Sequence, residues 1–127
     1  MSRKVLIVDD EPHIRALVEQ ALEDLEDLGI EFLSADNGED ALRLIVGERP
    51  ELVVLDVMMP KMNGYDVCRS VRAEGLVDVK IILLTAKGQE LDRSMGEEVG
   101  ADIYTTKPFD PDELLVLTRD FLGLDGT

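Results

Sequence analysis

Four strand-like segments of the sequence end in polar side chains that are suited to phosphoryl chemistry. These side chains are, in chain order, Asp9 with Asp10, Asp56, Thr85 and Lys107. A carboxylate can attack phosphorus and form an aspartyl phosphate, so Asp56 is the candidate nucleophile. A hydroxyl and an ammonium group beside it would hydrogen-bond and neutralise the oxygens of the transferring group.

The three carboxylates in this set require a positively charged partner. At 4 Å each pair repels by roughly 1–4 kcal/mol, so either some carboxyls are protonated or a cation lies among them. Oxygen ligands without His or Cys favour a hard ion, here Mg²⁺, with Mn²⁺ as a substitute. Ordinary surface acids are the alternative for Asp9 and Asp10 taken alone. Because the sequence has no Gly-rich phosphate loop, ATP is not the expected direct donor.

The segments that carry these groups alternate with helical patterns along the chain. Strands are predicted from three apolar runs at residues 5–8, 52–55 and 81–84, from a short segment at 30–35 and from a half-polar run at 102–106. Alternation of this kind predicts an α/β fold, with a parallel sheet and helices on both faces. The carboxyl ends of parallel strands share one edge, where ligands of such folds bind, so the polar groups are expected to meet there.

Helix boundaries are marked by capping residues. Pro12 opens a helical stripe that continues to Leu28 and stops at Gly29, while Asn37 and Asp110 are predicted N-caps of two later helices. The segment 89–99 has a thin apolar stripe and an interior Gly, which costs roughly 1 kcal/mol against Ala. It is therefore predicted to be among the least stable helices.

Composition indicates one globular domain, assigned to residues 1–122, with a short tail or linker at 123–127. The net charge is −15, from 28 acids and 13 bases, which disfavours direct contact with nucleic acid or anionic lipid. A solvated acidic surface is the simpler explanation for most of this excess. Cys68 is the single cysteine and is predicted to be a core residue. No signal peptide or membrane span is expected, and a cytoplasmic location is the default.

Several motifs resemble the receiver domain of bacterial two-component response regulators over nearly the whole chain. They are Val8-Asp9-Asp10-Glu11, Leu55-Asp56-Val57-Met58-Met59-Pro60-Lys61-Met62-Asn63-Gly64, Leu84-Thr85-Ala86 and Lys107-Pro108-Phe109. Each motif alone is moderately specific, and together they are highly specific. The resemblance, to receivers of the chemotaxis-regulator type, implies a flavodoxin-like sheet of five strands in the order 2-1-3-4-5.

The resemblance also implies a signalling switch. Asp56 would accept a phosphoryl group from a histidine kinase or phosphotransfer protein, with Lys107, Thr85 and Ala86 at the transferring group. Mg²⁺ would be bound by the side chains of Asp10 and Asp56 and the backbone carbonyl of Met58, and by Asp9 through water. The phosphorylated form would act on a downstream effector protein or a separate output domain.

Two further features follow from the resemblance alone. The bond before Pro108 would be cis, and Thr85 and Tyr104 would form the switch pair that responds to phosphorylation. For Tyr104, a half-buried aromatic of an edge strand is an equally good explanation. His13 is expected to face solvent, with the donor histidine on the partner.

The sequence departs from one large DNA-binding subfamily of receivers. Where those relatives carry Ala-Asp-Asp-Tyr, this chain has Ala101-Asp102-Ile103-Tyr104, and its last helix has only Arg119 as a base. This favours a single-domain regulator, or a receiver with another type of output, over the ion-paired dimer of those relatives.

Two rival functions remain open at this point. A Mg²⁺-dependent phosphohydrolase would commonly need a second acid two residues after Asp56, where this chain has Met58. A flavin or nucleotide module would need backbone amides at its phosphate loop, whereas residues 9–12 offer negative charge and a proline.

Overall fold

Five parallel strands form one sheet in the order β2-β1-β3-β4-β5, which confirms the predicted fold class. The computed structural model describes residues 3–86, 100–107 and 109–124, so the predicted helix at 89–99 and Pro108 lie outside the described residues. The strands are β1 (Arg3–Val8), β2 (Ile30–Ala35), β3 (Leu52–Asp56), β4 (Lys80–Ala86) and β5 (Ile103–Lys107). Each of the four neighbouring pairs is parallel.

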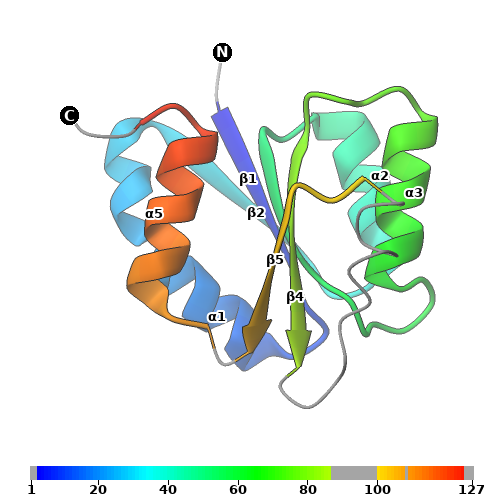
Figure 1. Cartoon of the computed structure of the whole chain (residues 1–127), viewed down its shortest axis with the longest axis horizontal. Coiled ribbons are helices and arrows are strands. Elements are labelled where there is room, and N and C mark those ends of the chain that lie inside the picture. The colour runs from blue at the N-terminus through cyan, green and yellow to red at the C-terminus, as the bar shows by residue number, and fades with distance from the viewer. Residues whose placement is uncertain (1–2, 87–99, 108, 125–127) are drawn as a thin grey trace.

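Helices cover both faces of the sheet (Figure 1). The described helices are α1 (Pro12–Ala21), the 3-10 helix η1 (Glu23–Leu28), α2 (Gly38–Glu48), α3 (Gly64–Ala73) and α5 (Pro111–Phe121). In Figure 1, α1 and α5 lie on one side of the sheet, and α2 and α3 lie on the other. Within the described part of the chain, no helix is long and apolar enough to cross a membrane.

The sheet separates two apolar cores because successive side chains of a strand point to opposite faces. In β3, Leu52 and Val54 pack in the core beneath α1 and α5, whereas Val53 and Leu55 pack in the core beneath α2 and α3. All four side chains are fully buried. Cys68 is buried in the second of these cores, as its position in the sequence predicted.

Two predicted N-caps are confirmed. The Asn37 side chain accepts a hydrogen bond from the Asp40 backbone N–H, and Asp110 accepts from the N–H groups of Asp112 and Glu113. Each cap satisfies backbone donors that have no partner within the first turn of a helix. The position of α5 and the start of α2 were therefore encoded locally.

The prediction of one helix from Pro12 to Leu28 was wrong. The α-helix ends at Ala21, and a 3-10 helix follows from Glu23, which leaves Leu25 buried and Leu28 about half exposed. The acids of residues 23–27 would lie at the carboxyl end of a continued α-helix, where the helix dipole disfavours negative charge. The apolar periodicity alone did not reveal this electrostatic cost, because it takes no account of the charged residues between the apolar positions.

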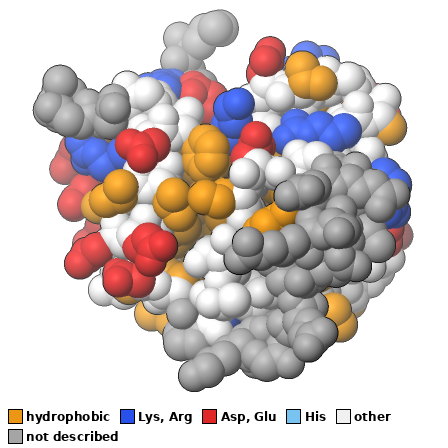
Figure 2. Space-filling view, viewed as in Figure 1, with side chains coloured by type: hydrophobic (Ala, Val, Ile, Leu, Met, Phe, Trp, Pro, Cys, Tyr) orange, Lys and Arg blue, Asp and Glu red, His pale blue; other side chains and the backbone are white. Residues whose placement is uncertain are grey.

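Acidic side chains are prominent on the surface near α5 (Figure 2), with apolar side chains beside them. Asp112 and Asp120 of α5 both belong to the exposed or half-exposed surface, and no pocket of converging carboxylates surrounds them among the described residues. The carboxylates of Asp112 and Asp120 are thus solvated. A different arrangement holds at the carboxyl edge of the sheet.

Candidate phosphoacceptor and metal site

The carboxyl ends of four neighbouring strands, β1, β3, β4 and β5, bring the candidate side chains together. Asp9 directly follows β1, Asp56 is the last residue of β3, and Lys107 is the last residue of β5. In the β4–β5 register Thr85 pairs with Thr106 and Ala86 with Lys107. Residues separated by almost a hundred positions therefore share one edge of the sheet, because all the strands run in the same direction.

Three carboxylates converge at this edge. Asp9, Asp10 and Asp56 each offer a carboxylate oxygen, and the three oxygens lie within 4.8 Å of one another. Asp9 and Asp56 are buried, whereas Asp10 is exposed. The cluster is thus closed on the protein side and open to solvent at Asp10.

Asp9 is held through both its backbone and its side chain. The Glu11 backbone N–H donates to Asp9 Oδ1 at 3.0 Å, and an Arg15 guanidinium N–H donates to the Asp9 carbonyl oxygen at 2.7 Å. Arg15 was not among the predicted site residues, because an arginine in the first half of a helix carries no signal of its own for a contact with the backbone of Asp9.

Lys107 supplies positive charge within the cluster. Its Nζ atom lies 2.7 Å from Asp9 Oδ2 and 3.3 Å from Asp56 Oδ1. Burial lowers the pKa of Lys107, but the hydrogen bonds and ion pairs with Asp9 and Asp56 outweigh burial and raise its pKa above the ordinary value. The ammonium group therefore stays protonated at neutral pH.

One lysine does not balance three carboxylates, and the effect appears at Asp56. Burial, followed by repulsion from Asp9, raises the pKa of Asp56 to about 6, although Lys107 opposes the shift. A carboxyl with so high a pKa has its charged form disfavoured by its surroundings. The site would gain stability from an additional cation.

The donor set fits a divalent metal ion. Its side-chain ligands are carboxylate oxygens, and the exposed Asp10 leaves room for retained water, which is typical of Mg²⁺ sites. The other group expected here, the Met58 carbonyl, belongs to the loop after β3, where the Met58 side chain is exposed. The raised pKa of Asp56 is an independent indication that the cluster is short of positive charge.

Thr85 contributes a hydroxyl that the described residues leave without a hydrogen-bond partner. The Thr85 side chain is 2 % exposed, and its Oγ1 atom is buried. A buried hydroxyl without a partner lowers the stability of the resting protein, and a ligand oxygen that accepts its hydrogen bond would remove that cost. Tyr104 is half-buried in β5 and packs against the α2–α3 core, so its role in a switch stays a prediction.

The remaining candidates have distinct placements. Ala86 ends β4, and Pro108 and its predicted cis bond lie outside the described residues. His13 is exposed and lies 3.3 Å from a Glu11 carboxylate oxygen, as expected for a solvent-facing side chain. The histidine that donates a phosphoryl group is therefore still expected on a partner.

The loop after β3 approaches the strand end through Gly64, whose role the sequence analysis had not recognised. A Cβ atom on Gly64 would lie 2.5 Å from the Asp56 carbonyl oxygen, and the Gly64 N–H donates to the Val57 carbonyl at 2.8 Å. The residue must be glycine for α3 to begin this close to Asp56.

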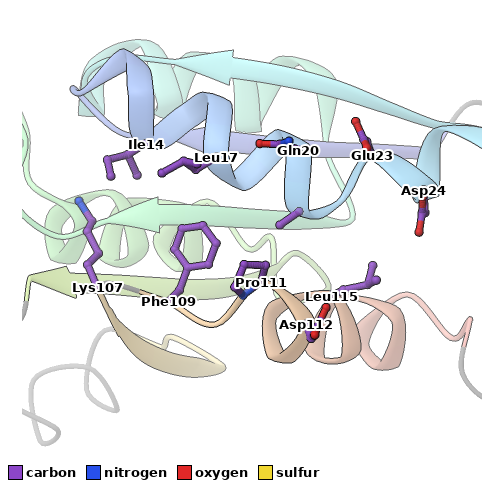
Figure 3. Close-up of a pocket in the computed structure, with 11 residues that line it drawn as sticks. Ile14, Leu17, Gln20, Glu23, Asp24, Lys107, Phe109, Pro111, Asp112 and Leu115 are labelled. Carbon is purple, nitrogen blue, oxygen red and sulfur yellow. The ribbon is translucent and has the colours of Figure 1, made fainter.

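A groove with an apolar part lies between α1 and the β5–α5 region (Figure 3), and Asp9, Asp10 and Asp56 are not among its lining residues. Ile14 and Leu17 of α1 face Phe109 and Leu115 of the β5–α5 region across a cavity volume of about 470 Å³. Lys107 lies at one end of the groove, as Figure 3 shows, and also contacts Asp9 and Asp56. The groove itself has no convergent metal ligands, so the chemistry belongs to the strand ends.

The fold is a doubly wound α/β fold, and three carboxylates and a lysine meet at the carboxyl ends of its strands. The model of the response regulator receiver domain family matches residues 5–119, and the chain belongs to this family.

Similar proteins agree with the family assignment. The chain is 50% identical over 119 residues to the "Probable transcriptional regulator ycf27" of Porphyra purpurea, covering 94% of this chain and 47% of that protein. It is 45% identical over 114 residues to the alkaline phosphatase synthesis transcriptional regulatory protein PhoP of Bacillus subtilis, covering 90% and 46%. The chain thus spans about half the length of these relatives.

A solved structure supports the fold. The chemotaxis response regulator CheY4 of Vibrio cholerae superimposes with a TM-score of 0.81 and 32% identity, covering 95% of this chain and 99% of that one. The predicted resemblance to chemotaxis-type receivers is therefore confirmed at the level of family and fold.

Proposed function

We propose that this chain is a phosphorylation-dependent signalling switch in which Asp56 is the phosphoacceptor. The observation that carries the proposal is the position of its buried carboxylate, beside Asp9 and Asp10 and 3.3 Å from the Lys107 ammonium group. The proposal assigns the switch to residues 1–122, with 123–127 as a tail or linker.

In the proposed reaction a carboxylate oxygen of Asp56 attacks phosphorus. An O–P bond forms as the P–N bond to a phosphohistidine of a histidine kinase or phosphotransfer protein breaks, and the electron pair leaves with the imidazole. Lys107 neutralises charge on the phosphoryl oxygens, and the Thr85 hydroxyl and the Ala86 backbone N–H donate hydrogen bonds to them.

A magnesium ion would be held by Asp9, Asp10, Asp56 and the Met58 carbonyl, with Asp9 acting through water. The ion supplies charge neutralisation of the incoming phosphoryl group. The carboxylates of this chain orient the site, and burial beneath the strand ends keeps bulk water away from Asp56. Mn²⁺, which accepts the same oxygen ligands, is expected to substitute.

Phosphorylation would be communicated through Thr85 and Tyr104. A phosphoryl oxygen gives the buried Thr85 hydroxyl a hydrogen-bond partner, and Tyr104 on the neighbouring strand β5 responds to the movement of Thr85. The face formed by the predicted helix at 89–99, which lies outside the described residues, together with β5 and α5 then changes its affinity for a partner. That partner is an effector protein or an output domain.

Direct contact of this domain with DNA is not part of the proposal. The net charge of −15 opposes binding to a polyanion, although relatives are named as transcriptional regulators. Nucleic-acid binding, where it occurs, is assigned to an output domain or a separate protein.

A phosphohydrolase is not favoured. Such an enzyme would use an acid two residues after the nucleophile to protonate its leaving group, and Met58 occupies that position. Turnover of a phosphomonoester by this chain would contradict the switch.

The test is the intact mass of the protein after incubation with acetyl phosphate, with and without Mg²⁺. We expect one added phosphoryl group that requires Mg²⁺ and is lost completely in Asp56→Asn. The matched control is Asp66→Asn, because Asp66 is an acid of α3 outside the carboxylate cluster and its variant should be labelled normally. Labelling without metal, or labelling that persists in Asp56→Asn, would refute the assignment.

A further inference from the structure

We propose that Gly38, the first residue of α2, is a positioning residue for the metal site, because it fixes the loop that carries the Met58 carbonyl. This inference rests on the proposed function. Gly38 lies outside the acidic cluster, and its effect on the site passes through the loop of residues 57–63 between β3 and α3.

The contact between Gly38 and this loop leaves no room for a side chain. A Cβ atom built on Gly38 would lie 2.0 Å from the Met62 carbonyl oxygen and 2.7 Å from both the Met62 carbonyl carbon and the Met62 Cβ. Gly38 is not among the residues with positive φ. Its backbone could therefore accept an L-amino acid, and only the neighbouring loop forbids one.

The helix side of the contact is firmly held. Asn37 is 5 % exposed, and its side chain accepts from the Asp40 N–H at 2.9 Å while donating to the carboxylates of Asp36 at 2.8 Å and Asp40 at 2.9 Å. The Asn37 carbonyl also accepts from the Ala41 N–H. The first turn of α2 cannot easily retreat, so an added methyl group must displace the loop.

The ends of the loop are tied to the sheet, and its middle is held by a turn, in which the Met62 N–H donates to the Pro60 carbonyl at 2.8 Å, and by packing of Met59 and Met62 against the core beneath α2 and α3. The Val57 N–H donates to the Leu84 carbonyl at 3.0 Å, and the Gly64 N–H donates to the Val57 carbonyl at 2.8 Å. Between these anchors Lys61 has φ of 70°. Because the Met62 N–H is bonded to the Pro60 carbonyl, we expect displacement of Met62 to pass back along the loop to Met58, whereas Asp56 is fixed within β3.

The same helix contains an ideal control position. Gly47 also lies in α2, and a Cβ atom there would meet nothing within 4 Å. Gly47→Ala therefore introduces the same methyl group into the same helix without touching the loop.

The experiment compares the parent protein with Gly38→Ala and Gly47→Ala. Binding of Mn²⁺ is followed by electron paramagnetic resonance, and the labelling rate with acetyl phosphate is followed as a function of Mg²⁺ concentration. In Gly38→Ala we expect metal affinity to fall about 10-fold, as for other groups that orient metal ligands, while labelling at saturating Mg²⁺ stays near the parent rate. Gly47→Ala should match the parent in both.

A metal-free measurement complements these values. Amide hydrogen exchange over residues 57–63 should be faster in Gly38→Ala than in Gly47→Ala, because the displaced loop loses its support. Equal metal affinity and equal exchange in the two variants would overturn the inference. A parent protein that binds no metal and is not labelled at Asp56 would instead refute the proposed function.

A second variant guards against failure to fold. Lys61→Gly relieves the positive φ at Lys61, so in Gly38→Ala/Lys61→Gly the loop can move away from the new methyl group. We expect this double variant to fold, as judged by circular dichroism, and to show the weakened metal binding. If neither variant folds while Gly47→Ala does, the contact supports the fold and not the site, and the inference is wrong.

Discussion

Charged side chains gather both where the strands of the sheet begin and where they end, but their charges are balanced at one of these edges and not at the other. At the edge where β4 and β5 begin, the Arg72 guanidinium donates to the carbonyl oxygens of Leu76, Val79 and Gly100 at 2.6–3.0 Å. It also contacts the Asp102 carboxylate at 3.1 Å. Asp102 in turn accepts from the Ile81 N–H at 2.8 Å. The positive and negative groups of this edge are matched.

At the opposite edge the groups are not matched. Three carboxylates share one lysine, the pKa of Asp56 is raised to about 6, and the Thr85 hydroxyl has no hydrogen-bond partner among the described residues. Groups in this condition lower stability in the resting protein and bind strongly to a ligand of complementary charge. The balanced charges around Arg72 therefore stabilise the fold, whereas the unbalanced carboxylates at the carboxyl edge favour binding of a cation.

The largest effect on stability is expected from the matched edge. Arg72→Met removes the guanidinium that donates to three backbone carbonyls and to the Asp102 carboxylate. The free energy of unfolding, measured by urea denaturation, should therefore fall by about 2–4 kcal/mol. Arg69→Met, in the same helix but with an exposed ion pair, should cost about 0.5 kcal/mol or less. A similar decrease in the free energy of unfolding in both variants would show that the buried contacts of Arg72 do not stabilise this edge.

A change of opposite sign is expected at the carboxyl edge. Without metal, Asp56→Asn should stabilise the protein at pH 7–8 by about 1–3 kcal/mol, because it removes a carboxylate whose charged form the site disfavours. In the folded protein the pKa of Asp56 is raised from its ordinary value of 3.8 to about 6. The folded state therefore holds the proton more tightly than the unfolded state, and the parent protein loses stability as pH rises from about 4 through about 6.

The measurement is urea denaturation of the parent protein and of Asp56→Asn at several pH values. The difference in unfolding free energy should vanish near pH 4 and shrink on addition of Mg²⁺, which stabilises the charged form in the parent. A parent protein that is more stable than Asp56→Asn at pH 8 without metal would contradict the mismatch at this edge.

The smallest effect on stability is expected at Thr85. Thr85→Val removes a buried hydroxyl that lacks a protein partner, so the unfolding free energy should change by less than about 1 kcal/mol. Labelling of Asp56 should nevertheless slow by about tenfold or more, because a donor to the phosphoryl oxygens is lost. Thr118→Val is the control, since its hydroxyl is also buried without a partner among the described residues but lies in α5. Slower labelling in both variants would remove the special role of Thr85.

Much of this architecture was predictable because its signals are local. Uninterrupted apolar runs specified strands buried on both faces, and Asn37 and Asp110 specified helix starts through their own side chains. The expectation that Asp9, Asp56 and Lys107 would meet required one further rule, that parallel strands share their carboxyl edge. The end of α1 at Ala21 was missed because helical periodicity alone ignores charge at the helix end.

By itself the sequence determined the order of strands and helices along the chain and the chemical types of the groups at the strand ends. Those properties follow from the periodicity and composition of short segments. Only the tertiary structure decided that Arg72 donates hydrogen bonds to the backbone just before β4 and β5, that Arg15 donates to the Asp9 carbonyl, and that Gly38 lies against Met62. Each of these contacts joins elements whose separation in space depends on how helices pack on the sheet, and no short segment encodes that distance.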